Sequence, residues 1–132
     1  VPVLHIPLMI VPFILYNMAL AGFPSGNPFP AELVSVTMIS GGIWTMNIGE
    51  ALVALGLVFM FFEILKSTLT SSASVIDHVL STFVFVAFLV EFLVVSGAAT
   101  SVFFLLMLMA LVDLMAGFSV SIRSAGRDVS IG

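Results

Sequence analysis

Long apolar runs, broken at only a few places, are the dominant pattern along this chain. Predominantly apolar stretches cover residues 2–21, 45–66, 77–96 and 101–121, and a polar tail follows at residues 122–132. A helix needs about 20 apolar residues to cross the hydrocarbon core of a bilayer, and each stretch reaches that length. The pattern predicts an all-α integral membrane protein whose four transmembrane helices form one compact bundle, a single domain over residues 1–132.

Two features modify the first half of this picture. The first stretch contains Pro7 and Pro12, each of which removes a backbone hydrogen-bond donor, so we expect a kink in the first helix. The sequence is compatible with two starts for the second helix, one at about Ile43 and one at Ile48. The later start leaves Glu50 at the membrane interface, whereas the earlier start buries it by about two turns.

Between the first two helices lies a segment that is too short to cross a membrane. Residues 22–30 hold three prolines and two glycines, which predict a loop. Residues 31–40 then predict a short interfacial or re-entrant segment, with Pro30 at the first position of a helix. A strand is the alternative, since Val34 and Val36 favour it, but an unpaired strand cannot lie in lipid. Three aromatic side chains near this segment fit a membrane-interface belt: Phe23, Phe29 and Trp44.

Composition supports the membrane assignment and narrows the partners. The chain is 61% hydrophobic and 8% charged, whereas soluble domains average about 25% charged residues. The absence of cysteine excludes disulfides and thiolate metal sites, and only three Lys and Arg residues exclude a nucleic-acid footprint. The expected partners are therefore the lipid bilayer and either other membrane subunits or further copies of this chain.

The basic residues predict an orientation. Lys66 follows the second helix, and Arg123 and Arg127 follow the fourth, so in a four-helix hairpin arrangement all three lie on one side. Because positively charged residues concentrate in cytoplasmic segments, we expect both termini in the cytoplasm.

Four acidic residues lie within or beside the predicted helices, and they are the main candidates for a functional role. Glu50 and Glu91 fall toward the outer side, together with Asn17, whereas Glu63 and Asp113 fall toward the cytoplasmic side. His5 also falls toward the cytoplasmic side. A charged acid at the centre of a bilayer costs about 2.5–3.5 kcal/mol, so such residues usually serve as proton or cation sites or as partner contacts.

Several of these polar residues also have a structural interpretation. Glu63 and Lys66 are three residues apart on a helix and can form an ion pair. Glu50 suits the start of a helix, where a negative charge is favourable, and Asp77 suits an N-terminal cap. Ala110, Asp113, Gly117 and Ser121 share one stripe of the fourth helix, and small residues in such a stripe predict close packing against another helix.

The chemistry-bearing motifs of enzymes are missing from this sequence. His5 and His78 lie on different predicted helices, and two uncertain ligands do not make a metal or haem site. Neither a phosphate loop, nor a nucleophile elbow, nor a zinc-binding helix motif is present. We therefore predict no metal, no cofactor and no enzyme activity.

Two functional hypotheses follow from the sequence. The first is a non-catalytic accessory or structural subunit of a larger membrane complex, in which the acids pair with a neighbour and the interfacial segment is a docking surface. The alternative is a homo-oligomeric proton or cation conduit, in which Glu91 and Asp113 carry the ion and the small-residue stripe of the fourth helix joins the protomers.

Overall fold

The computed structural model describes residues 6–23, 26–69 and 74–131; within these ranges the side chains of residues 67–69, 74–75 and 120–131 are left undescribed. His5 lies outside the described residues. The helices and strands follow in chain order: α1 (Ile10–Gly22), β1 (Glu32–Thr37), β2 (Ile43–Asn47), α2 (Ile48–Leu69), α3 (Ser74–Val94), a 3-10 turn η2 (Ser96–Ala98) and α4 (Ser101–Ile131).

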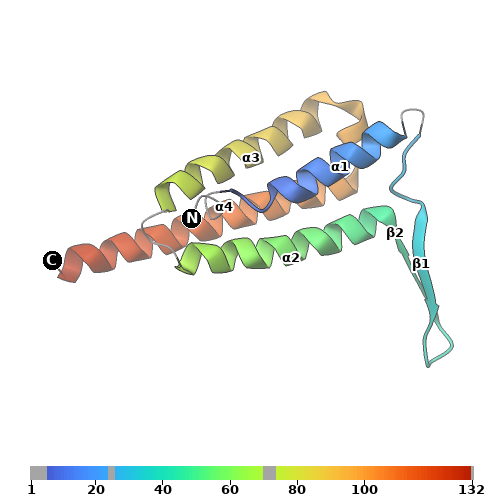
Figure 1. The fold of residues 1–132 in the computed structure, drawn as a ribbon, viewed down its shortest axis with the longest axis horizontal. Helices are drawn as coiled ribbons and strands as arrows, with labels where there is room; N and C mark the ends of the chain where they lie inside the picture. Colours follow the sequence, from blue (N-terminus) through green and yellow to red (C-terminus); the bar gives the residue numbers. More distant parts are fainter. Residues whose placement is uncertain (1–5, 24–25, 70–73, 132) are drawn as a thin grey trace.

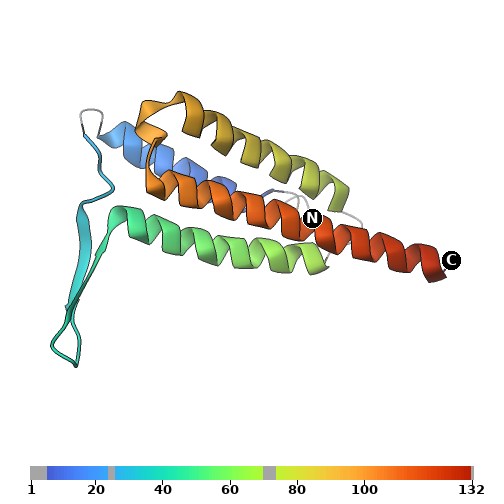
Figure 2. The same ribbon diagram turned by 180° about the vertical axis from the view of Figure 1, so that it is seen from behind.

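The four helices lie side by side with their axes roughly aligned (Figures 1 and 2). Helix α4 packs against both α2 and α3, and α1 contacts α2 and α4. Strands β1 and β2 form an antiparallel hairpin at the end of the bundle where α2 and α4 begin. We call this the hairpin end, and we call the end where α2 finishes and α3 starts the opposite end.

Three of the helices are long and apolar enough to cross a membrane. These stretches are Ile48–Lys66, Ile76–Val94 and Ser101–Ser119, each of 19 residues. Many large apolar side chains point outward from them, including Phe61, Leu93 and Met115. Helix α2 begins at Ile48, the later of the two starts open from the sequence, and α4 continues through the polar tail to Ile131.

Helix α1 differs from the long kinked helix expected from the sequence. It begins at Ile10 and has 13 residues, and a non-helical segment precedes it. Pro12 therefore falls in the first turn, where its missing N–H has no partner within the helix in any case. The prolines thus delay the start of the helix, and the Ile10 N–H donates to the Pro7 carbonyl at 3.2 Å.

The region between α1 and α2 is a β-hairpin, which corrects the all-α prediction and the short helix placed after Pro30. Residues 43–47 form the second strand and pair with residues 32–37, so the strand is not the unpaired one that the sequence argument rejected. The turn between the strands closes with Gly41 at a φ of +89°, a conformation that favours glycine. The Met38 N–H donates to the Gly42 carbonyl at 2.7 Å across this turn.

An aromatic cluster fills the centre of the bundle near the hairpin end. Phe88 of α3 and Phe103 of α4 are fully buried, with ring centroids 5.3 Å apart. Phe13 of α1 meets Phe88 edge-on at 4.9 Å, and Tyr16 stacks on Phe29 at 4.2 Å. These contacts attach the short helix α1 to the longer helices.

Candidate functional site

Three charged side chains meet in the interior at the opposite end of the bundle. Lys66 Nζ lies 3.3 Å from Glu63 Oε2 and 3.2 Å from Asp77 Oδ1. All three residues are buried: Lys66 is 8% exposed, Glu63 is 1% exposed and Asp77 is 7% exposed. Charges removed from water need nearby counter-charges, and the two ion pairs of Lys66 supply part of this compensation.

Local sequence explains how this group assembles. Glu63 and Lys66 share one face of the last part of α2, and the pair expected from their spacing is present. The chain then reverses into α3, which brings Asp77 in its first turn to the same place. Asp77 lies inside α3 because the helix starts at Ser74, so the predicted N-terminal cap is instead an ion-pair partner of Lys66.

The same two side chains of α2 bind the backbone in front of α1. The Leu8 N–H donates to Glu63 Oε2 at 2.8 Å, and Lys66 Nζ donates to the Ile6 carbonyl at 2.8 Å. Buried backbone outside a helix must find hydrogen-bond partners elsewhere in the protein. Glu63 and Lys66 thus replace the hydrogen bonds that a longer helix would make. Sequence reasoning missed these contacts, although the prolines in this region were a signal that the helix could not start earlier.

Asp113 adds a third buried carboxyl group to this end of the bundle. It is 6% exposed, and its charged form is repelled by Glu63 and Asp77 and attracted by Lys66. Glu63 Oε1 is also buried, and it has no hydrogen-bond partner among the described residues. We call Glu63, Lys66, Asp77 and Asp113 the polar cluster.

The small-residue stripe of α4 faces the interior of the protein. Ala110 is 2% exposed, and Gly117 lies against the His78 ring. A Cβ atom at Gly117 would come within 2.6 Å of His78 Cε1, so glycine gives α3 room to approach. His78 also stacks on Phe118, with centroids 4.9 Å apart. The side chain of Ser121 lies outside the described residues.

A second group of polar residues lies near the hairpin end. The Tyr16 hydroxyl donates to the Gly97 carbonyl at 2.8 Å and shares a hydrogen bond of 2.8 Å with Thr100 Oγ1. Asn17 Nδ2 donates to the Phe13 carbonyl at 2.9 Å, and the Asn17 side chain also interacts with the Glu91 carboxylate. Glu91 is half-buried, and its Oε2 atom has no hydrogen-bond partner among the described residues.

Glu50 is exposed and belongs to the start of α2. Asn47 Oδ1 accepts a hydrogen bond from the Glu50 N–H at 2.7 Å, and Glu50 Oε1 accepts one from the Asn47 N–H at 3.0 Å. This reciprocal pattern is a capping box, which satisfies two helix-end donors. The spacing Asn47-Ile-Gly-Glu50 is the sequence signal for it.

The interior between the two polar regions is apolar. From Thr100 to Asp113 along α4 is about 20 Å at the rise of a helix. The residues of α4 that are buried along this distance all have apolar side chains: Phe103, Leu106, Met107, Met109 and Ala110. In the part of the chain that the structure describes, these side chains separate Glu91 from the polar cluster.

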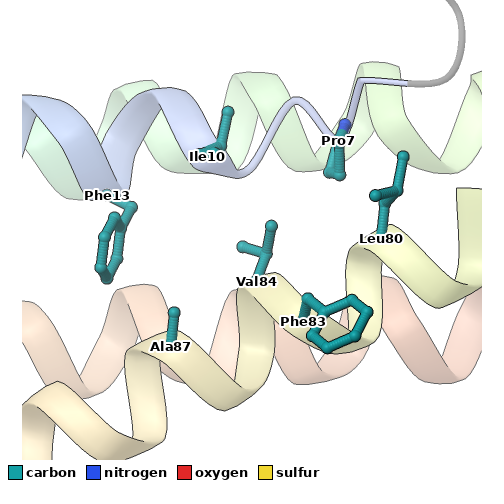
Figure 3. Close-up of a pocket in the computed structure, with 7 residues that line it drawn as sticks. All are labelled: Pro7, Ile10, Phe13, Leu80, Phe83, Val84 and Ala87. Carbon is teal, nitrogen blue, oxygen red and sulfur yellow. The ribbon is translucent and has the colours of Figure 1, made fainter.

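An apolar groove opens between the start of α1 and the face of α3 (Figure 3). Its volume is about 230 Å³, and every side chain that lines it is a hydrocarbon: Pro7, Ile10, Phe13, Leu80, Phe83, Val84 and Ala87. Without a polar group in its wall, the groove offers neither acid–base chemistry nor an ion site.

The described residues contain no group of three or more His, Asp or Glu side chains arranged to hold a metal ion. No protein-family model, curated protein or solved structure matches the chain. Its function therefore has to be inferred from the residues and their geometry.

Proposed function

We propose that this protein is a non-catalytic accessory subunit of a larger membrane complex, with four membrane crossings and both termini in the cytoplasm. Helix α1 spans about 20 Å, and the residues before it form a turn, in which the Ile10 N–H donates to the Pro7 carbonyl and the Val11 N–H to the Leu8 carbonyl. The hydrocarbon core is about 30 Å thick, so a crossing at this place needs the non-helical backbone before Ile10 as well as the helix. The polar cluster supports this fourth crossing, since it supplies partners for backbone that is not helical.

The chemistry of the polar cluster favours a structural role. Glu63, Lys66 and Asp77 bind one another and two backbone groups in front of α1. These contacts join α1, α2 and α3 at one place. A group engaged in so many internal contacts is suited to holding helices together.

The packing is unfavourable to the conduit alternative. Apolar side chains fill the interior between Glu91 and Asp113, so a proton or cation has no polar relay between them in the described part of the protomer. A conduit between protomers would need the stripe of α4 on the outer surface. Ala110, Asp113 and Gly117 are instead buried within the protomer.

The environment of Glu91 is the observation that supports the accessory role most directly. It is half-buried near the end of α3, and exposed apolar residues such as Val90 and Val94 adjoin it. In the described residues no ion pair reaches it, and Lys66 lies at the opposite end of the bundle. Asn17 interacts with this carboxylate, but Glu91 Oε2 has no hydrogen-bond partner among the described residues, so a basic or hydrogen-bond-donating side chain of a neighbouring membrane subunit is the expected partner.

The test compares two carboxamide variants that differ only in position. We expect Glu91→Gln to reduce the yield of partner subunits that purify with the tagged chain in mild detergent, because the charge that binds them is lost. Glu50→Gln, at an exposed acid near the same end, is expected to leave that yield unchanged. Retention of all partners by a folded Glu91→Gln variant would count against the proposal.

A further inference from the structure

The pairing of the two strands places four apolar side chains together on one face and the hydroxyl residues on the other. Residues directly opposite one another in an antiparallel pair project from the same face, and alternate residues share that face. Val34 pairs with Met46, and Val36 pairs with Trp44, so one face is apolar over these two pairs; the polar pair of Glu32 with Asn47 lies at the base of the hairpin, beyond an irregularity in the register. The other face is mixed: Ser35 pairs with Thr45, and Thr37 pairs with Ile43, so three hydroxyl groups share this face with the exposed side chain of Ile43.

Neither face of this hairpin is covered by the rest of the chain. All six residues of β1 are exposed, and β2 is exposed over its first three residues. Val36 and Trp44 on the apolar face each retain 44% of their surface. A two-stranded hairpin alone is marginally stable in water, and an exposed apolar strand edge promotes aggregation. The apolar face therefore needs a covering.

The charge pattern indicates what kind of covering is suitable. From Leu33 to Gly49 the sequence contains no Asp, Glu, Lys or Arg. Glu32, the first residue of β1, is therefore the one charged residue of the two strands, and no charged rim of the kind that surrounds protein-binding surfaces encloses them. A tryptophan beside small hydroxyl residues is typical of segments at a membrane–water interface. There the apolar part of the indole contacts lipid while its N–H reaches water.

The direction of the hairpin is consistent with a position at the membrane–water interface. It leaves the bundle at the beginning of α2 and runs across the helix axes, extending past α2 on the side away from α1 and α3 (Figures 1 and 2). If the helices cross a bilayer, a segment with this direction lies in the plane of the membrane surface. It then extends over the lipid beside α2, at the end of the hydrophobic spans.

We infer that the hairpin is a membrane-surface anchor that lies in the boundary between lipid headgroups and acyl chains. Val34, Val36, Trp44 and Met46 face the acyl chains. The opposite face, which carries three hydroxyl residues and Ile43, lies toward the headgroups: Ser35, Thr37 and Thr45. The unpaired outer edges of β1 and β2 then meet water and headgroup donors and acceptors, which the hydrocarbon region could not supply. Because the hairpin has no basic residue, and its one charged residue is the acid Glu32 at the start of β1, its binding needs no anionic lipid.

Trp44 is the only tryptophan of the chain, so its fluorescence reports on this face without labelling. The purified full chain is reconstituted in phosphatidylcholine vesicles, with and without lipid brominated at shallow or deep acyl positions. We expect Trp44 emission to be blue-shifted. Shallow bromines should quench it several-fold more than deep ones, and aqueous iodide should quench it weakly.

A matched variant moves the indole to the other face of the hairpin. In Trp44→Phe combined with Thr45→Trp, the ring projects toward the headgroups, and we expect iodide to quench it several-fold more than it quenches Trp44. Trp44→Phe keeps an aromatic residue in the apolar face, and circular dichroism of the variant checks its folding.

Two results would overturn the inference. If iodide quenches Trp44 as strongly as it quenches the indole at position 45, the hairpin lies in water. If neither iodide nor brominated lipid quenches Trp44, a protein surface covers the apolar face, either a second copy in the vesicle or another part of this chain.

Discussion

Lys66 connects parts of the chain that are distant in sequence. It pairs with Glu63 in its own helix and with Asp77 at the start of α3, and it donates to the Ile6 carbonyl 60 residues away. Its side chain is therefore the principal positive charge among three buried carboxyl groups. Removing one member of a buried ion pair is more damaging than removing the whole pair, because the remaining charge stays buried without compensation.

This arrangement predicts a large effect of Lys66→Met. We expect the free energy of unfolding to fall by about 3–5 kcal/mol, since Glu63 and Asp77 lose their counter-charge. The measurement is denaturant unfolding in mixed micelles, followed by circular dichroism. Combining Lys66→Met with Glu63→Gln and Asp77→Asn should recover part of the loss. A single variant as stable as Glu50→Gln would contradict this role for Lys66.

The capping box at the start of α2 joins two elements, because the last residue of β2 caps the first turn of the helix. Asn47→Ala removes the acceptor of the Glu50 N–H, which lies 2.7 Å from Asn47 Oδ1. We expect a loss of about 0.5–2 kcal/mol in the stability of this helix end. Hydrogen exchange at the Glu50 amide should become faster. Thr45→Ala, on the polar face of the hairpin, is the control; equal exchange in the two variants would refute the cap.

The long helices could be predicted from the sequence because their signal is local. Apolar runs of about 20 residues need no knowledge of their neighbours, and α2, α3 and α4 appear where these runs lie. The hairpin depends instead on pairing between residues 32–37 and 43–47, and the second of these segments resembled the beginning of a membrane helix. The Gly41-Gly42 turn signal was present, but its meaning depended on that partner strand.

The polar cluster likewise has contacts that could be predicted from the sequence and contacts that could not. The contact between Glu63 and Lys66 follows from helical spacing, whereas the contact between Glu63 and the Leu8 N–H joins residues 55 positions apart. Such a contact depends on where α1 begins, and only the packed structure determines that. The inward direction of Asp113 followed from its small neighbours on α4, but not the identity of the helix that it faces.

At the scale of the whole molecule, the proposed orientation makes a direct prediction. The chain contains no cysteine, so single-cysteine variants have no background. Ser71→Cys lies in the connection from α2 to α3, and Ser96→Cys lies in the connection from α3 to α4. We expect a membrane-impermeant maleimide to label Ser96→Cys in intact cells and Ser71→Cys only after permeabilisation, as the positive-inside bias requires. The reverse pattern would place both termini outside.

The mass and composition of the native particle, extracted in a mild detergent, test the accessory role most directly. An accessory subunit should emerge in a fixed ratio with other membrane subunits, and these should carry a basic or donor side chain at the level of Glu91. A particle that contains this chain alone, as a monomer or as a homo-oligomer, would contradict the proposed function.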